Sequence, residues 1–151
     1  MTKFLDDAWM RNNGFADRGW ETASVGELLR ALPRRELVTA TGGETVAEAV
    51  KRMKSKGISQ LPVVEDGRLI GIMTESDVLG RLVDGRASLE SKVAEVMFRN
   101  VRTIEEGADA GQLTRLFADG LVALVVDDSR ALRGIVTKLD LVDYLTRTSG
   151  T

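Results

Sequence analysis

The chain has 151 residues, of which 43% are hydrophobic, so it can build one compact domain or two small fused halves with a sizeable core. Its 21 basic and 23 acidic residues nearly balance, which argues against a nucleic-acid-binding protein, and no apolar run approaches the ~20 residues of a membrane span. The absence of Cys and His excludes disulfides, thiolate metal sites and the commonest general base. Acidic residues near the N-terminus argue against a secretory signal, so a cytoplasmic location is expected.

The leading residues, 1–34, are predicted to form an N-terminal helical linker segment. Apolar residues cluster over Phe4 to Met10, and a short helix is expected over Val25 to Leu32.

A first repeat is predicted over residues 35–87, with the element order β-α-β-β-α. The helix that starts near Val46 has its apolar residues at helical spacing and is expected to end at Gly57 as a C-cap. The turn Glu65-Asp66-Gly67 is a strong hairpin signal. The strands are expected over 37–40, 60–64 and 69–74, and the last helix is expected to begin at Glu75.

A helical connector over residues 88–98 is predicted to lead into a second repeat over 99–148. Shifting the sequence by 63 residues places Gly71 on Gly134, Thr74 on Thr137 and Asp77 on Asp140. The corresponding strands are expected over 101–104, 122–126 and 132–137, with helices over 113–117 and from 138 onward.

These patterns predict an α/β (α+β) fold with two small mixed sheets of about three strands each, and with helices packed on them. A unit of ~60 residues buries little surface alone, so the two repeats are expected to pack as a pseudo-symmetric pair.

The repeat resembles the CBS domain, a family named after cystathionine β-synthase, and a tandem pair of such domains is called a Bateman module. The resemblance rests on the stretches 57–64 and 71–77 in the first copy and on 121–126 and 134–140 in the second. In addition, Lys3 to Met10 is similar to the stretch that joins the catalytic domain to the regulatory tail in cystathionine β-synthases. This similarity implies that the chain is the C-terminal regulatory region of such a pyridoxal-phosphate (PLP) enzyme. The other interpretation is that the chain is a free-standing module.

The Thr-x-x-Asp motif at the junction of a strand and a helix can bind a ribose. The carboxylate of Asp77 or Asp140 can accept hydrogen bonds from two vicinal hydroxyls, and the helix N-terminus adds free N–H groups and partial positive charge. The alternative is that Thr74, Thr137 and the two aspartates are helix caps, each worth ~1 kcal/mol.

The family resemblance implies two ligand clefts, each drawing on both repeats, and an adenosyl ligand in at least one of them. The first cleft would combine Thr137, Asp140, Ile135 and Leu139 with Leu37, Ile58 and Gln60. The second would combine Thr74, Asp77, Ile72 and Ser76 with Arg102, Leu121 and Ala123.

The ligand class stays open between S-adenosylmethionine and the nucleotides AMP, ADP and ATP, and no other cofactor is expected. Phosphates would need cations, for which Arg34, Arg35, Arg99, Arg102 and Lys138 are candidates, although each can equally be a solvated surface charge. The expected partners are a second copy of the chain, paired through the repeat helices, and a catalytic PLP domain. No nucleic acid or membrane partner is expected.

The leading hypothesis is a regulatory module, not an enzyme, that controls an attached or partner enzyme allosterically. The alternative is a dimerisation or docking module whose ligand clefts are vestigial. A small nucleotide-hydrolysing enzyme is disfavoured by the lack of His and of a Gly-rich phosphate loop.

Overall fold

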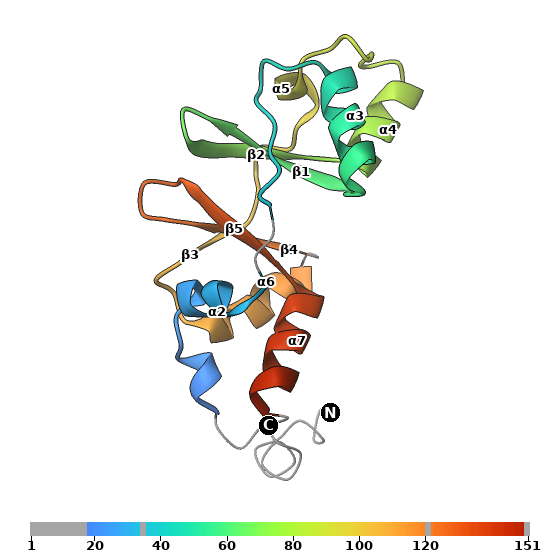
Figure 1. The fold of residues 1–151 in the computed structure, drawn as a ribbon. Coiled ribbons are helices and arrows are strands. Elements are labelled where there is room, and N and C mark those ends of the chain that lie inside the picture. Colours follow the sequence, from blue (N-terminus) through green and yellow to red (C-terminus); the bar gives the residue numbers. More distant parts are fainter. Residues whose placement is uncertain (1–17, 34–35, 120–121, 150–151) are drawn as a thin grey trace. The chain divides into compact units, whose positions relative to one another are not determined.

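The computed structural model describes residues 18–33, 36–119 and 122–149, and the chain divides into two compact units (Figure 1). Unit 1 is built from the described parts of three segments, 1–35, 102–127 and 133–151. Unit 2 is built from residues 36–101 and 128–132. Within the described residues, no helix is long and apolar enough to cross a membrane.

Unit 2 contains a β-hairpin with helices packed on it. The strands β1 (Gln60–Glu65) and β2 (Arg68–Thr74) pair antiparallel. Asp66 and Gly67 turn the chain between them with positive φ angles of 52° and 79°, as the sequence predicts for a tight hairpin turn. The helices are α3 (Val46–Lys56), α4 (Glu75–Val83) and α5 (Val93–Val96).

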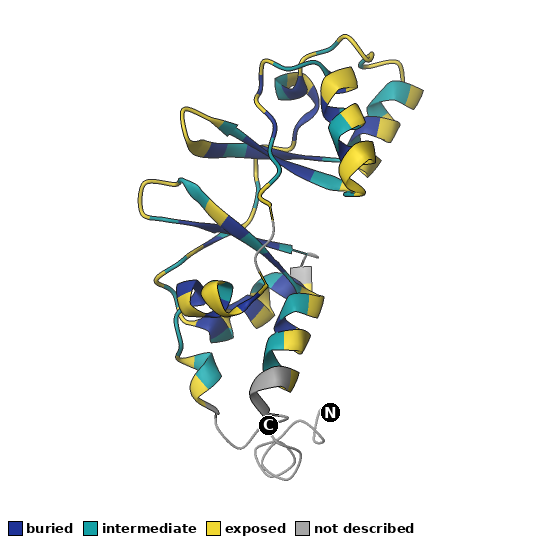
Figure 2. Cartoon of the chain, in the orientation of Figure 1, coloured by how far each residue is buried: buried dark blue, intermediate teal, exposed yellow. Residues whose placement is uncertain are grey.

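Helix α3 has clear start and stop signals in the sequence. Thr45 caps its N-terminus, because its hydroxyl accepts the N–H of Glu48 while the Glu48 carboxylate accepts the N–H of Thr45. Gly57 ends the helix with φ 66°, in the left-handed region that a glycine adopts without strain. The apolar face of α3, including Ala49 and Met53, lies in the core of unit 2 (Figure 2).

Unit 1 contains a three-stranded sheet in the order β3-β4-β5, with β3 parallel to β4. Its core includes Leu113 and Phe117 of α6, Val125 of β4 and Leu141 of α7. The elements are η2 (Arg18–Glu21), α2 (Val25–Ala31), β3 (Thr103–Glu105), η3 (Ala110–Gln112), α6 (Leu113–Asp119), β4 (Val122–Val126), β5 (Leu132–Thr137) and α7 (Lys138–Ser149).

The short helices α2 and α5 are a pair of equivalent elements that the sequence comparison missed. Val25 donates its N–H to the carbonyl of Ala108 at 2.8 Å, and Val93 donates in the same way to Glu44 at 2.8 Å. Their N3 glutamates both accept the N–H of the N-cap residue. These two valines are 68 positions apart, so this part of the repeat does not align at the shift of 63 that fits the strands.

The predicted N-terminal linker therefore supplies part of the core of unit 1. Val25 and Leu28 of α2 are fully buried there, against residues of the second repeat such as Leu113. In unit 2, Val93 and Val96 of α5 occupy the equivalent place in the core of the first repeat.

Three details differ from the sequence prediction. The strand expected over 37–40 is reduced to a single parallel bridge between Ala40 and Val63, so the first repeat has a two-stranded sheet. Val38 and Ala40 face the core of unit 2 and Leu37 is 40% exposed, but only Ala40 has a backbone pairing partner, and a strand needs a neighbouring strand along its length. The connector 88–98 is helical over only four residues, and β3 begins two residues later than expected.

Candidate functional site

The first Thr-x-x-Asp motif lies where β2 runs into α4. Thr74 is the N-cap of α4, and its Oγ1 accepts the N–H of Asp77 at 3.1 Å. The same hydroxyl donates to Oδ2 of Asp77 at 2.9 Å. Both side chains are partly buried. The strand ladder fixes the junction further, because Thr74 is the pairing partner of Gln60 in β1.

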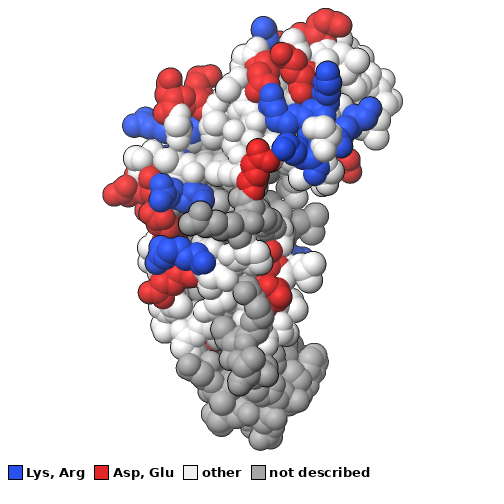
Figure 3. Space-filling view, viewed as in Figure 1, with Lys and Arg blue, Asp and Glu red and all other residues white. Residues whose placement is uncertain are grey.

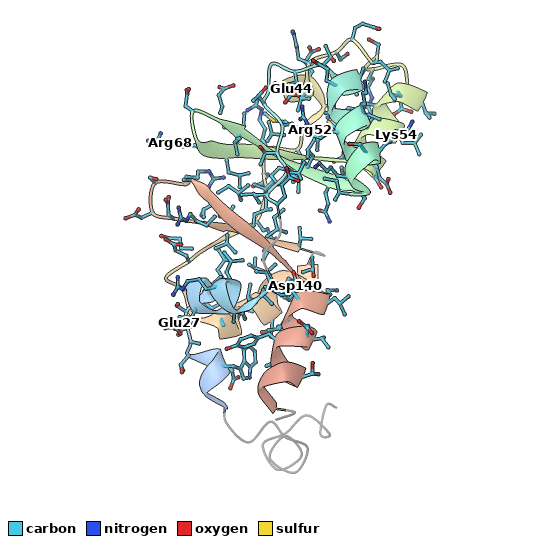
Figure 4. The ribbon with its side chains drawn as sticks, in the orientation of Figure 1. Glu27, Glu44, Arg52, Lys54, Arg68 and Asp140 are labelled. Carbon is cyan, nitrogen blue, oxygen red and sulfur yellow. The ribbon has the colours of Figure 1, made fainter. Side chains whose placement is uncertain are left out.

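The second motif lies at the equivalent junction between β5 and α7, where Figure 4 labels Asp140. Oγ1 of Thr137 accepts the N–H of Asp140 at 3.1 Å, and Oδ2 of Asp140 accepts the N–H of Thr137 at 2.8 Å. This reciprocal pair is a capping box. In both motifs the threonine hydroxyl thus caps the helix, but the aspartate carboxylate has different partners. In unit 2 it accepts a hydrogen bond from the Thr74 hydroxyl, and in unit 1 it accepts one from the backbone N–H of Thr137.

The capping geometry sets what each carboxylate can do chemically. A carboxylate has about four lone-pair positions on its two oxygens, and the hydrogen bond from the Thr74 hydroxyl uses one of them in Asp77. The Asp77 carboxylate can therefore accept two vicinal hydroxyls of a ribose without breaking its cap. The structure is consistent with both the helix-cap role and the ribose-binding role that the sequence left open.

The other predicted residues of unit 2 have distinct environments. Ile72 is buried, and its backbone exchanges two hydrogen bonds with Phe98, at 2.9 and 2.8 Å. Ile58 packs against the core of unit 2 and lines a groove between α3 and α4. Ser76 is exposed at the start of α4, and Leu37 lies in the extended segment before Ala40.

In unit 1, Ile135 of β5 is partly buried and Leu139 of α7 is 74% exposed. Ala123 is fully buried in the core of unit 1, with no surface open to a ligand in this structure. Arg102 is exposed. Leu121 lies outside the described residues, as do Arg34, Arg35 and the stretch from Lys3 to Met10.

Sequence reasoning missed two features near the predicted residues. Phe98 is an aromatic residue with 52% of its surface exposed, and its backbone is paired with Ile72. An aromatic ring in this position can stack on a flat ligand. In the sequence, the signal is an aromatic residue directly after the apolar pair Val96-Met97. The prediction of a helix over 88–98 hid this signal, because it made Phe98 part of the connector.

The second missed feature is an ion pair between Glu44 and Arg52, joined by two hydrogen bonds (Figure 4). The Arg52 guanidinium holds the pKa of the Glu44 carboxyl below its usual value of 4.5, and the N–H of Thr41 adds to this effect. Hydrogen bonds from Thr45 lower the pKa of Glu48 in the same way. The side chains of Arg52 and Glu44 are 33% and 19% exposed, so solvent screens this pair only in part.

A groove of about 480 Å³ lies between α3 and α4 in unit 2. Its lining is mostly apolar and includes Val50, Leu79 and Leu82, while Lys54 and Glu75 add one charge of each sign. Leu79 and Val83 of α4 are 63% and 75% exposed beside it. Among the described residues, no cluster of acidic side chains could hold a metal ion.

Solved structures of known proteins share this fold. A protein with CBS domains from Burkholderia ambifaria is 29% identical, with a TM-score of 0.69 over 82% of this chain and 94% of that chain. The CBS domain pair of protein MJ0100, solved in complex with 5′-methylthioadenosine and S-adenosyl-L-methionine, is 28% identical, with a TM-score of 0.64 over 80% of this chain and 93% of that chain.

Among curated proteins, cystathionine beta-synthase from Dictyostelium discoideum is 30% identical over 96% of this chain. The chain spans about a third of the length of that enzyme, 32%, and 29% of the rabbit enzyme that it also matches.

The family model for the CBS domain matches the chain twice, over residues 25–84 and 93–147. Both matches begin at the valine that opens a short leading helix, Val25 of α2 and Val93 of α5, which agrees with the equivalence of these helices in the structure. From the first long helix onward, the order helix, strand, strand, helix in each unit also agrees with the repeat inferred from the sequence. The chain therefore belongs to the CBS domain family and is a tandem CBS domain pair.

Proposed function

We propose that this CBS domain pair is a regulatory module that binds an adenosyl compound and controls an attached or partner enzyme. The observation that carries the proposal is the repeated Thr-x-x-Asp junction, in which Asp77 and Asp140 stand in the first turn of α4 and α7. Further support comes from the CBS domain pair of protein MJ0100, whose structure contains 5′-methylthioadenosine and S-adenosyl-L-methionine.

In the proposed site, each aspartate accepts hydrogen bonds from the two ribose hydroxyls, and the helix N-terminus contributes its partial positive charge. The first cleft would combine Thr137 and Asp140 with the segment around Leu37, and the second would combine Thr74 and Asp77 with the segment around Arg102. For regulation, the ligand must favour one state of the module, and a tenfold preference corresponds to ~1.4 kcal/mol of coupling.

The controlled enzyme is proposed to resemble a cystathionine β-synthase. The support is the 30% identity to the Dictyostelium enzyme over nearly the whole of this chain. Under this proposal the chain is a cytoplasmic regulatory region, and the PLP chemistry belongs to a catalytic domain outside it.

The experiment that tests ligand binding uses Asp→Asn variants, because asparagine keeps a carbonyl oxygen for the cap but loses the negative charge. Thermal unfolding of the wild type, Asp77→Asn and Asp140→Asn is followed with S-adenosylmethionine, 5′-methylthioadenosine, AMP, ADP and ATP. A ligand at ~100 times its dissociation constant should stabilise the protein by ~2.7 kcal/mol. We expect at least one variant to melt at the wild-type temperature without ligand and to lose the shift that the ligand causes in the wild type. If no ligand shifts the melting temperature of the wild type, the binding function is rejected.

A second candidate function is a dimerisation module, and the groove between α3 and α4 favours it. Leu79 and Val83 expose large apolar surfaces beside an apolar groove, which is typical of a face that another protein covers. The proposed occupant is a second copy of this chain. Figure 3 shows Lys and Arg side chains gathered over α3, and the groove itself is lined by Lys54 and Glu75, so a second copy can present a charge opposite to each. Dimerisation and ligand binding are compatible, so both can hold.

A further inference from the structure

The first segment of each repeat is held in place differently. In unit 1, β3 forms a parallel ladder with β4, in which Thr103, Ile104 and Glu105 all have partners. In unit 2, the equivalent segment makes only the bridge between Ala40 and Val63. Two hydrogen bonds form this bridge, from Ala40 to the Pro62 carbonyl and from Val64 to the Ala40 carbonyl, both at 2.9 Å.

Side chains of α3 and of the turn before it supply additional contacts to this segment in unit 2. Nη1 of Arg52 donates to the carbonyl oxygen of Thr39 at 3.0 Å and to Oε2 of Glu44 at 3.2 Å, and Nη2 donates to Oε1 of Glu44. Oε2 of Glu44 also accepts the N–H of Thr41 at 2.7 Å. We call this set of contacts among Arg52, Glu44, Thr39 and Thr41 the Arg52 clamp.

The clamp joins both sides of Ala40 to α3. Thr39 precedes the bridging residue and Thr41 follows it, and each has a backbone group bound to the Arg52–Glu44 pair. A planar guanidinium that engages both carboxylate oxygens has a fixed orientation, so its remaining bond to Thr39 is directional. At the other end of the segment, Lys56 and Glu36 form an ion pair at 2.8 Å, but both side chains are well exposed and contribute little.

No such clamp is found among the described residues of the second repeat. Ala108 occupies the position of Glu44, because its carbonyl accepts the N–H of Val25 as the Glu44 carbonyl accepts that of Val93. At the same offset of 64 positions, Leu116 occupies the position of Arg52, and its side chain cannot form hydrogen bonds. The neighbouring Arg115 of α6 is exposed, without a hydrogen bond or ion pair to another described residue. The clamp is thus found where the strand ladder is missing.

We propose that Arg52 is a positioning residue that holds the segment 36–40 in place of a strand ladder and thereby sets the affinity of the cleft that contains Leu37. Arg52 acts on the ligand only through the backbone of Thr39 and Ala40. The part of the inference that concerns affinity rests on the proposed function. The two clefts are then unequal, since the edge around Leu37 depends on one ion pair and the edge around Arg102 depends on the ladder of β3.

The first test measures amide hydrogen exchange at Ala40 and Val64 without ligand. We expect Arg52→Ala to accelerate exchange at both amides by about tenfold, because charge-assisted hydrogen bonds are lost. Glu44→Gln, which keeps the size of the side chain, should give a smaller acceleration. Arg115→Ala is the matched control and should leave both amides at the wild-type rate. Equal rates in Arg52→Ala and Arg115→Ala would overturn the proposal.

The second test measures the affinity for S-adenosylmethionine and for AMP by calorimetry in two backgrounds. Arg52→Ala should weaken binding about five- to tenfold in Asp77→Asn, where the cleft with Leu37 remains, and should leave binding unchanged in Asp140→Asn. Equal weakening in both backgrounds would indicate a general loss of structure and would contradict a positioning role. If the wild type binds neither ligand, the proposed function fails, while the exchange rates still decide whether the clamp exists.

Discussion

Gly134 in β5 lies directly against the side chain of Leu29 in α2: a Cβ added to this glycine would come within 2.7 Å of Leu29 Cδ2. The equivalent Gly71 in β2 lies against Met97, where a Cβ would come within 2.8 Å of the sulfur and 2.9 Å of the Phe98 carbonyl oxygen. The glycine that recurs in both repeats therefore makes room for the chain segment that begins with each leading helix. Its role in the structure is close packing.

This relationship predicts unequal effects of alanine at the two glycines. Gly71→Ala meets a backbone oxygen that cannot rotate away, so we expect it to lower the free energy of unfolding by about 2 to 3 kcal/mol. Gly134→Ala meets only the end of a leucine side chain, so we expect about 1 kcal/mol. Urea unfolding at neutral pH measures both values.

Gly80→Ala in α4 is a suitable control for that comparison, because a Cβ there meets no atom within 4 Å. Alanine should stabilise this helical position by about 0.5 to 1 kcal/mol. If Gly71→Ala lowered the free energy of unfolding no more than Gly80→Ala does, the result would contradict the close approach between β2 and the Met97–Phe98 segment.

The Glu44–Arg52 pair predicts a dependence of stability on pH. The pKa of Glu44 is lowered in the folded protein, so its ionised form stabilises the fold above the usual value of 4.5. The stabilisation is lost as the pH falls through 4.5 and then through the lower pKa of the folded state. Because Arg52 is 33% exposed, we expect a contribution of about 1 kcal/mol.

The measurement is the difference in free energy of unfolding between the wild type and Glu44→Gln, taken from about pH 7 down to about pH 3. We expect a constant difference at neutral pH that shrinks below 4.5, where Glu44 becomes protonated. Glu48, whose pKa is also lowered, is present in both proteins and cancels. A difference that stays constant throughout this range would show that the charge of Glu44 does not stabilise the fold.

The exposed apolar side chains of α4 predict self-association. Leu79→Glu and Val83→Lys each place a charge beside the groove, and burial of such a charge in an interface is costly. We expect either variant to weaken dimerisation by at least tenfold in sedimentation velocity, with an unchanged circular dichroism spectrum.

Leu89→Ser is a useful companion variant, because Leu89 lines the groove from the loop after α4 and is 46% exposed. It should weaken dimerisation less than a charge does. A wild-type protein that stays monomeric at all concentrations would reject dimerisation through this face. The groove would then need another occupant.

The sequence predicted the elements that local signals define. Gly57 at the end of α3 and Asp66-Gly67 between β1 and β2 have the positive φ angles that these residues favour, so their turns follow from residue type alone. The strands β4 and β5 have the predicted bounds, because continuous apolar residues between polar turns leave few alternatives. The Thr-x-x-Asp junctions were likewise found from their spacing.

The features that the sequence did not predict depend on partners far away in the chain. Residues 37–40 have a β-prone composition, but a strand forms only where a neighbouring strand satisfies its hydrogen bonds, and there only Ala40 is paired. The equivalence of α2 and α5 was hidden by a loop of different length, and it is visible only because both helices donate hydrogen bonds to equivalent carbonyls.

The sequence by itself determined that the chain is a tandem repeat and where its turns and caps lie, since these follow from backbone preferences of single residues and from short apolar patterns. Only the tertiary structure decided which segments complete each core and how Arg52 reaches Thr39, 13 positions away. The physical reason is that packing and ion pairs depend on distances in space, which residues acquire only when the chain has folded.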